Sequence, residues 1–220
     1  TQQAMRALHR VRESLIKDKV KTTNQMHAFL LEFGISLPKG EAVIKRLSLV
    51  LAEYDVPDYL SRLLMKLHAH YLYLVEQITT LELELKQSIK ADDATQRMMT
   101  IPGVGPITAS LLSSQLGDGK QFSCSRDFAA SMGLVPRQYS TGGKPTLLGI
   151  SKRGNKNLRR LLVQCARVFM MRLEHQHGRL AEWVQAQLSK KHSNVVACAL
   201  ANKLARIAWA ITTRQNEYQA

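Results

Sequence analysis

The spacing of apolar residues predicts a protein built almost entirely from helices. Residues 1–55 place apolar side chains three and four positions apart, which predicts two or three helices, with Gly34 as a helix stop and a further helix over about 41–54. After Pro57 the steps alternate between four and three residues, the period of a coiled coil. This apolar seam consists of Leu60, Leu64, Leu67, Tyr71, Leu74, Ile78, Leu81 and Leu85. One helix is expected from Pro57 to about residue 94.

The apolar seam needs a partner, because a helix this long cannot bury itself against a compact domain. Either the helices of residues 1–55 or a second subunit can cover it. We favour a second subunit, since the seam is longer than any helix we expect within residues 1–55. The seam therefore predicts a homodimer or a tetramer.

The character of the sequence changes near residue 95. Gly, Pro and Ser become frequent after Arg97, and shorter helices are predicted over about 155–173, 179–189 and 194–212. Strand patterns are nearly absent, and residues 133–150 are interpreted as an irregular loop. We predict an all-α fold with two domains, a helical coiled-coil dimerisation region over 1–95 and a compact helical domain over 96–220.

Charge points to a polyanionic partner. The net charge is +14 and the pI is about 10.0, and such a charge repels itself unless a polyanion offsets it. We find neither an apolar run of about 18 residues nor a signal sequence, so we expect no membrane association. The three cysteines lack metal-ligand spacing, which is typical of reduced thiols in a cytoplasmic protein. We therefore expect no metal site in this chain.

Residues 98–112 resemble the helix-hairpin-helix element of DNA repair and recombination proteins. The sequence Ile-Pro-Gly-Val-Gly at 101–105 lets the backbone turn sharply, and Pro106 suits the first position of a following helix. Unpaired N–H groups and the helix dipole there favour a phosphate, bound without base readout. Gly103, Gly105 and Thr108 are therefore predicted to contact nucleic acid; the alternative is a plain helical corner.

A basic block follows over residues 120–172. Eleven basic residues stand there against one acid, Asp127. The helix predicted after Asn155 is amphipathic, and its basic face follows a Gly-rich basic loop, which favours nucleic-acid contact over a merely solvated face. The predicted contacts are Arg137, Lys144, Lys152, Arg153, Lys156, Arg159 and Arg160. We expect Trp183 and Trp209 to anchor the core rather than to stack on bases.

A hydroxyl pair, Ser140 and Thr141, precedes Gly142 and Gly143 within the basic block. Hydroxyls beside glycines are exposed, and neighbouring cations stabilise charge on a phosphoryl group. By composition alone, a flexible loop explains the segment equally well. A serine needs activation to attack, and the acids after residue 95 are scattered, so metal-assisted chemistry would need carboxylates from elsewhere.

Three motifs together, at 101–105, 133–144 and 149–160, resemble one family: insertion-sequence transposases with an N-terminal DEDD, RuvC-like domain, relatives of the pilin-gene DNA invertase. The resemblance implies an RNA-guided DNA recombinase of the bacterial cytoplasm and nucleoid, acting as dimers that pair into tetramers. It implies a guide RNA bridging target and donor DNA, a serine nucleophile linked covalently to DNA, and Mg²⁺ held by the RuvC-like domain. Alignment with some relatives places the nucleophile at Thr141, whereas serine chemistry favours Ser140, our choice.

No DEDD domain is recognised in residues 1–55, so we expect this chain to be the C-terminal part of a transposase, with no cofactor of its own and inactive alone. The alternative is a non-enzymatic scaffold that binds nucleic acid through its helix-hairpin-helix element. A third interpretation is a basic helical protein with a protein partner only.

Overall fold

The computed structural model describes residues 2–38 and 40–219. The chain divides into a long-helix unit, Ala7–Leu85, and a C-terminal unit, which joins Thr1–Arg6 to Lys86–Ala220. Apart from two short strands, the regular elements of the described residues are helices, so the all-α prediction is confirmed.

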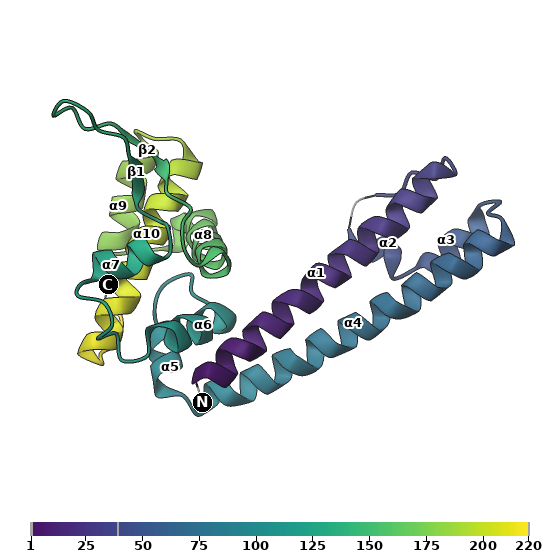
Figure 1. Cartoon of the computed structure of the whole chain (residues 1–220), viewed down its shortest axis with the longest axis horizontal. Coiled ribbons are helices and arrows are strands. Elements are labelled where there is room, and N and C mark those ends of the chain that lie inside the picture. Colours follow the sequence, from purple (N-terminus) through teal and green to yellow (C-terminus); the bar gives the residue numbers. More distant parts are fainter. Residues whose placement is uncertain (1, 39, 220) are drawn as a thin grey trace. The chain divides into compact units, whose positions relative to one another are not determined.

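The long-helix unit is built on α1 (Gln2–Glu32) and α4 (Asp58–Lys90), which run alongside each other (Figure 1). Two short helices, α2 (Glu41–Ile44) and α3 (Leu47–Glu53), lie between them in the chain. Gly34 has φ 76° just beyond α1, as a helix stop requires. The single helix predicted over about 41–54 is replaced by the two helices α2 and α3. The core of this unit consists of Met26, Leu30, Ile35, Ile44, Leu47, Leu64 and Tyr71.

The apolar seam of α4 is covered within the chain. Five of its residues are buried: Leu64, Tyr71, Leu74, Ile78 and Leu85. Our expectation that the seam outruns the N-terminal helices was wrong, because α1 is one helix of 31 residues beside an α4 of 33. An ion pair between Arg12 of α1 and Glu82 of α4 joins the two helices farther along, away from the core around Leu30 and Leu64. The helix α4 ends at Lys90, since Asp92 caps the next helix by accepting from Ala94 N–H.

The C-terminal unit packs its helices around α10 (Ser193–Arg214). The preceding helices are α5 (Asp93–Met99), α6 (Pro106–Leu116), α7 (Ser125–Ser131), α8 (Lys156–Met171) and α9 (Arg179–Leu188). The three helices predicted after Asn155 are confirmed, with Asn155 capping α8 through Leu158 N–H at 3.0 Å. By length and composition α10 could cross a membrane, but Leu200, Leu204 and Ala208 are fully buried in the core, as in the central helix of a globular unit.

Residues 133–150 contain a β hairpin, which corrects the prediction of an irregular loop. Strand β1 (Pro136–Gln138) pairs antiparallel with β2 (Leu147–Ile150), with Pro136 opposite Ile150 and a register shift before Gln138. Both strands are short and largely exposed, so they lack the apolar alternation that identifies a buried strand. The pairing depends instead on how the base of the hairpin is held.

Gly133 fixes that base. Its φ is 69°, and a Cβ there would stand 2.1 Å from the carbonyl oxygen of Arg153, so only glycine lets the two chain segments approach this closely. Two backbone hydrogen bonds follow, from Ser151 N–H to Val135 O at 2.8 Å and from Lys152 N–H to Gly133 O at 3.1 Å. Asn202 of α10 donates to Leu134 O at 3.2 Å, which fastens the hairpin base to the central helix.

Candidate nucleic-acid interface

The α5–α6 turn carries the predicted phosphate grip, and Gly103 in it faces the protein. A Cβ at Gly103 would lie 2.7 Å from the Cys165 carbonyl oxygen on α8, and φ is 80°. A Cβ at Gly105 would meet no atom within 4 Å, and this glycine is the N-cap of α6, with Pro106 at the start of the helix. Close packing against α8 therefore accounts for Gly103, while Gly105 keeps space on its outer side.

Thr108 does not belong to the surface. Its side chain is 5% exposed, and its hydroxyl accepts a hydrogen bond from Cys165 Sγ at 3.5 Å. The Thr108 side chain is therefore not placed to contact nucleic acid, and a contact of this residue through its backbone N–H, in the first turn of α6, stays a prediction. Burial raises the pKa of Cys165, while its hydrogen bonding with Thr108 and with the Gly105 backbone acts in the opposite direction. These contacts fasten the α5–α6 turn to α8.

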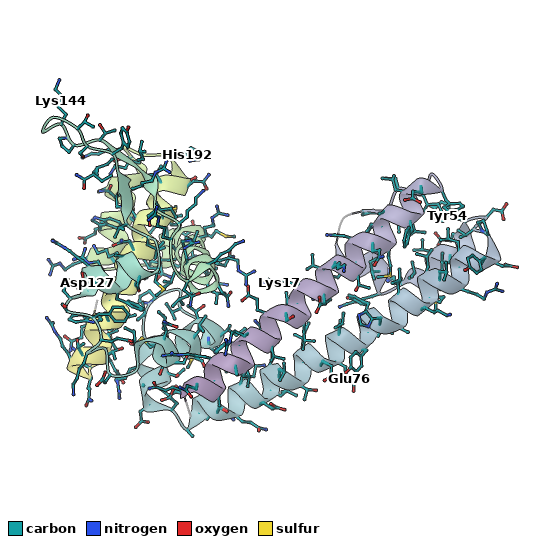
Figure 2. The ribbon with its side chains drawn as sticks, in the orientation of Figure 1. Lys17, Tyr54, Glu76, Asp127, Lys144 and His192 are labelled. Carbon is teal, nitrogen blue, oxygen red and sulfur yellow. The ribbon has the colours of Figure 1, made fainter. Side chains whose placement is uncertain are left out.

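The tip of the β hairpin carries both candidate nucleophiles. Ser140 and Thr141 are exposed, and Ser140 Oγ accepts a hydrogen bond from Gln138 Nε2 at 2.9 Å. Thr141 pairs with Lys144, whose N–H donates to Thr141 O at 3.1 Å, so the glycines between them close a tight turn. Lys144 projects from the far end of the hairpin (Figure 2). A hydroxyl at this tip is open to a large substrate.

Arg159 has a structural task at the hairpin base. Its guanidinium donates to Met132 O at 2.9 Å and to Arg153 O at 3.3 Å. Among the other predicted contacts, Arg153, Lys156 and Arg160 are exposed around the start of α8, where Arg160 donates to Asn157 Oδ1 at 2.9 Å. The predicted contacts at the start of α8 thus divide into one cation, Arg159, that holds the hairpin and three that face solvent.

A groove of about 1080 Å³ lies between the β hairpin and α10; we call it the α10 groove. Its basic lining residues are Arg137, Lys152, Lys191, Lys203 and Arg206. None of the residues that line it is acidic. The structure therefore brings together two predicted contacts, Arg137 and Lys152, with three that the sequence reasoning missed. The sequence does contain a pattern that could have indicated these three cations, because no acid occurs between Glu182 and Glu217.

Cations crowd together at the α10 groove. The Lys203 ammonium lies 4.3 Å from the centroid of the Trp183 ring, a cation–π contact. Burial lowers the pKa of Lys203, and the charges of Arg206 and Arg179 lower it further. Like charges that share a groove repel, so an anion bound there would relieve the repulsion.

The described part of the chain offers no group of three or more His, Cys, Asp or Glu placed to hold a metal ion. Its three cysteines are free, with Cys165 buried and Cys124 exposed. The fold and the groove thus define a basic helical protein suited to a polyanionic ligand.

Residues 95–182 match the sequence profile described as the Transposase IS116/IS110/IS902 family. The chain is 70% identical, over 97% of its length, to the transposase for insertion sequence element IS1328 of Yersinia enterocolitica. It is 38% identical to a probable family 20 transposase of Pseudomonas aeruginosa and 38% identical to the transposase for insertion sequence element IS1111A of Coxiella burnetii, each over 99% of its length. It spans 64%, 66% and 61% of these three relatives.

Proposed function

We propose that this chain is the DNA-binding and strand-exchange part of an insertion-sequence transposase. The observation that carries the proposal is the position of the hydroxyl-bearing tip on a β hairpin whose base lines an acid-free basic groove. The similarity to curated transposases over nearly the whole chain supports the same function. The chain spans about two thirds of these relatives, so the activity belongs to the longer protein.

DNA contact is proposed along the α10 groove and the exposed start of α8. Arg137 and Lys152 stand in the groove, while Lys156 and Arg160 stand at the start of α8. Lys144 would hold the phosphate next to the attacked one. Such contacts position the backbone without reading sequence, and specificity is proposed to come from a guide RNA.

Ser140 is the proposed nucleophile. Its Oγ would attack a backbone phosphorus, the bond from phosphorus to the neighbouring deoxyribose oxygen would break, and that oxygen would leave as a hydroxyl with a proton. The DNA end would remain joined to the serine through a phosphodiester. The hydroxyl of another strand would then attack the same phosphorus, form the new DNA bond and release the serine. Within the described residues no group of three or more carboxylates, histidines or cysteines is placed to hold Mg²⁺. Any Mg²⁺ is therefore proposed to be held by a RuvC-like domain of the longer protein. That longer protein is proposed to act in the bacterial cytoplasm as a dimer or tetramer.

The test uses the full-length transposase and its own element. Ser140→Ala should abolish the covalent protein–DNA adduct on a denaturing gel and abolish excision. Thr141→Ala tests the neighbouring hydroxyl, and Thr146→Ala is the matched control, because it removes an exposed hydroxyl from the same hairpin. Adduct formation that survives Ser140→Ala but not Thr141→Ala would transfer the role to Thr141. Survival in both variants would refute the nucleophile and leave the scaffold function.

A further inference from the structure

We infer that the α10 groove takes a single strand of nucleic acid, with a base stacked on Trp183 and the adjoining phosphates on Lys203 and Arg206. This deepens the proposed function and rests on it for the ligand class. Neither tryptophan stacking nor these α10 cations follow from the motifs recognised in the sequence.

Apolar side chains line the α10 groove together with its cations. They include Leu134, Leu148, Ile150, Val195 and Ile207. Duplex DNA presents phosphates and sugars on its outside and keeps its base faces stacked inside, so it has little to bury against these apolar side chains. A single strand exposes the faces of its bases to apolar and aromatic side chains while its phosphates reach the cations.

Trp183 stands where a base could reach it. The ring packs against the core of the C-terminal unit on one side and also lines the groove. A second pocket, of about 450 Å³, shares Trp183, Lys203 and Ile207 with the groove and adds Arg179 and Tyr218. The indole therefore lies between two adjoining hollows, the larger of which is open to the β hairpin.

Movement of Lys203 would free the face of the Trp183 ring for a base. In the structure its ammonium occupies the ring face, 4.3 Å from the centroid. A phosphate is a stronger partner for an ammonium than an indole ring is. When a strand enters, Lys203 exchanges the ring for a phosphate, and the vacated ring face accepts the base. Arg206 and Lys191 line the same groove and serve further phosphates.

The absence of acids among the lining residues selects a polyanion over an ordinary protein partner. If all five lining cations contact phosphates of a single strand, the salt slope of binding is about −3.5 in log–log form, at about 0.7 for each phosphate. DNA and RNA strands share this chemistry, and the experiment separates them.

The experiment uses intrinsic fluorescence of the 220-residue chain. Trp183 and Trp209 are the two tryptophans, so Trp209→Phe leaves Trp183 as the reporter. Twelve-residue oligo(dT) and oligo(U), and a duplex of equal length, are the ligands. We expect one or both single strands to quench the fluorescence saturably. Their dissociation constant should be about tenfold lower than that of the duplex. The stronger of the two single strands identifies the sugar that the groove prefers.

Variants read by fluorescence anisotropy of a labelled oligo(dT) or oligo(U) separate stacking from charge. Trp183→Ala should weaken binding about 5- to 150-fold, while Trp183→Phe, which keeps an aromatic face and the core packing, should lose much less. Lys203→Gln and Arg206→Gln should each reduce the salt slope by about 0.7. Lys120→Gln is the matched control, since this exposed lysine pairs with Asp118 and does not line the groove.

Equal quenching by duplex and single strands, or unchanged binding in a folded Trp183→Ala variant, would overturn the inference. Displacement of the strand by an equal charge concentration of polyglutamate would overturn it too, by indicating a general acidic partner. If groove variants still bind the strand as tightly as the wild type while the full-length protein forms its Ser140 adduct, this inference alone fails. If the strand binds as expected but Ser140→Ala and Thr141→Ala still form the adduct, the proposed strand exchange alone fails.

Discussion

The two glycines of the α5–α6 turn should respond to alanine substitution to very different degrees. At Gly103, alanine meets a backbone carbonyl at 2.7 Å and must adopt a φ near 80°. The left-handed backbone costs about 1–2 kcal/mol, and displacing a packed backbone costs about 1–3 kcal/mol more. We therefore expect Gly103→Ala to destabilise the C-terminal unit by about 2–5 kcal/mol.

Gly105 is the matched control position. Its φ is −93° and nothing lies within 4 Å of an added Cβ, so alanine fits without strain. Losing glycine at an N-cap and stiffening the unfolded chain act in opposite directions, each by less than about 1 kcal/mol. Gly105→Ala should leave stability nearly unchanged. If a phosphate approaches this N-cap closely, however, the methyl group should weaken nucleic-acid binding.

Thermal unfolding followed by tryptophan fluorescence measures the difference, because Trp183 and Trp209 both belong to the C-terminal unit. At about 2–4 °C for each kcal/mol, Gly103→Ala should lower the melting temperature by about 4–20 °C, and Gly105→Ala should change it by no more than about 4 °C. Equal melting temperatures for the wild type and Gly103→Ala would refute the packing argument. Weaker binding in Gly105→Ala with unchanged stability would support the phosphate contact.

Three further predictions concern His9, Cys165 and Arg159. Burial, and then the charge of Arg12, lower the pKa of His9 from 6.5 to about 4, so the folded state favours the neutral ring. The folded state is therefore stabilised above pH 6.5, and about 3 kcal/mol of that stability is lost as pH falls toward 4. Urea unfolding at pH 7 and pH 4.5 should show a smaller loss in His9→Gln than in the wild type, and an equal loss would contradict the assignment. Because burial raises the pKa of Cys165, iodoacetamide should alkylate exposed Cys124 first and reach Cys165 only after unfolding, as peptide mapping can check. Arg159→Ala should cost about 1–3 kcal/mol and speed amide exchange at the hairpin base, whereas a purely DNA-binding arginine would leave both unchanged.

Helix positions were the most predictable part of this fold. The ends of α8, α9 and α10 lie within two residues of their predicted positions, because apolar spacing, the Asn155 cap and nearby glycines are all local signals. The break between α2 and α3 and the β hairpin escaped prediction. The hairpin strands bury little, and the contacts that hold them join Gly133 and Arg153, twenty residues apart.

The candidate site was only half predictable. Exposure of Ser140, Thr141 and Lys144 follows from the glycines beside them, and the structure agrees. Thr108 is buried against Cys165 on α8, which no local pattern reveals. The α10 groove joins Arg137 and Lys152 to Lys191, Lys203 and Arg206, from segments far apart in the chain.

The sequence by itself determined the basic, helical character of the protein, the seam of α4 and the glycine-flanked hydroxyls, since composition and periodicity act over a few residues. Only the tertiary structure decided what covers the seam, which cations share a groove and which instead hold a loop. Each of these depends on the side chains that distant segments bring into contact, and a linear pattern does not contain that information. A charge becomes part of an interface only where packing leaves it beside others of its kind.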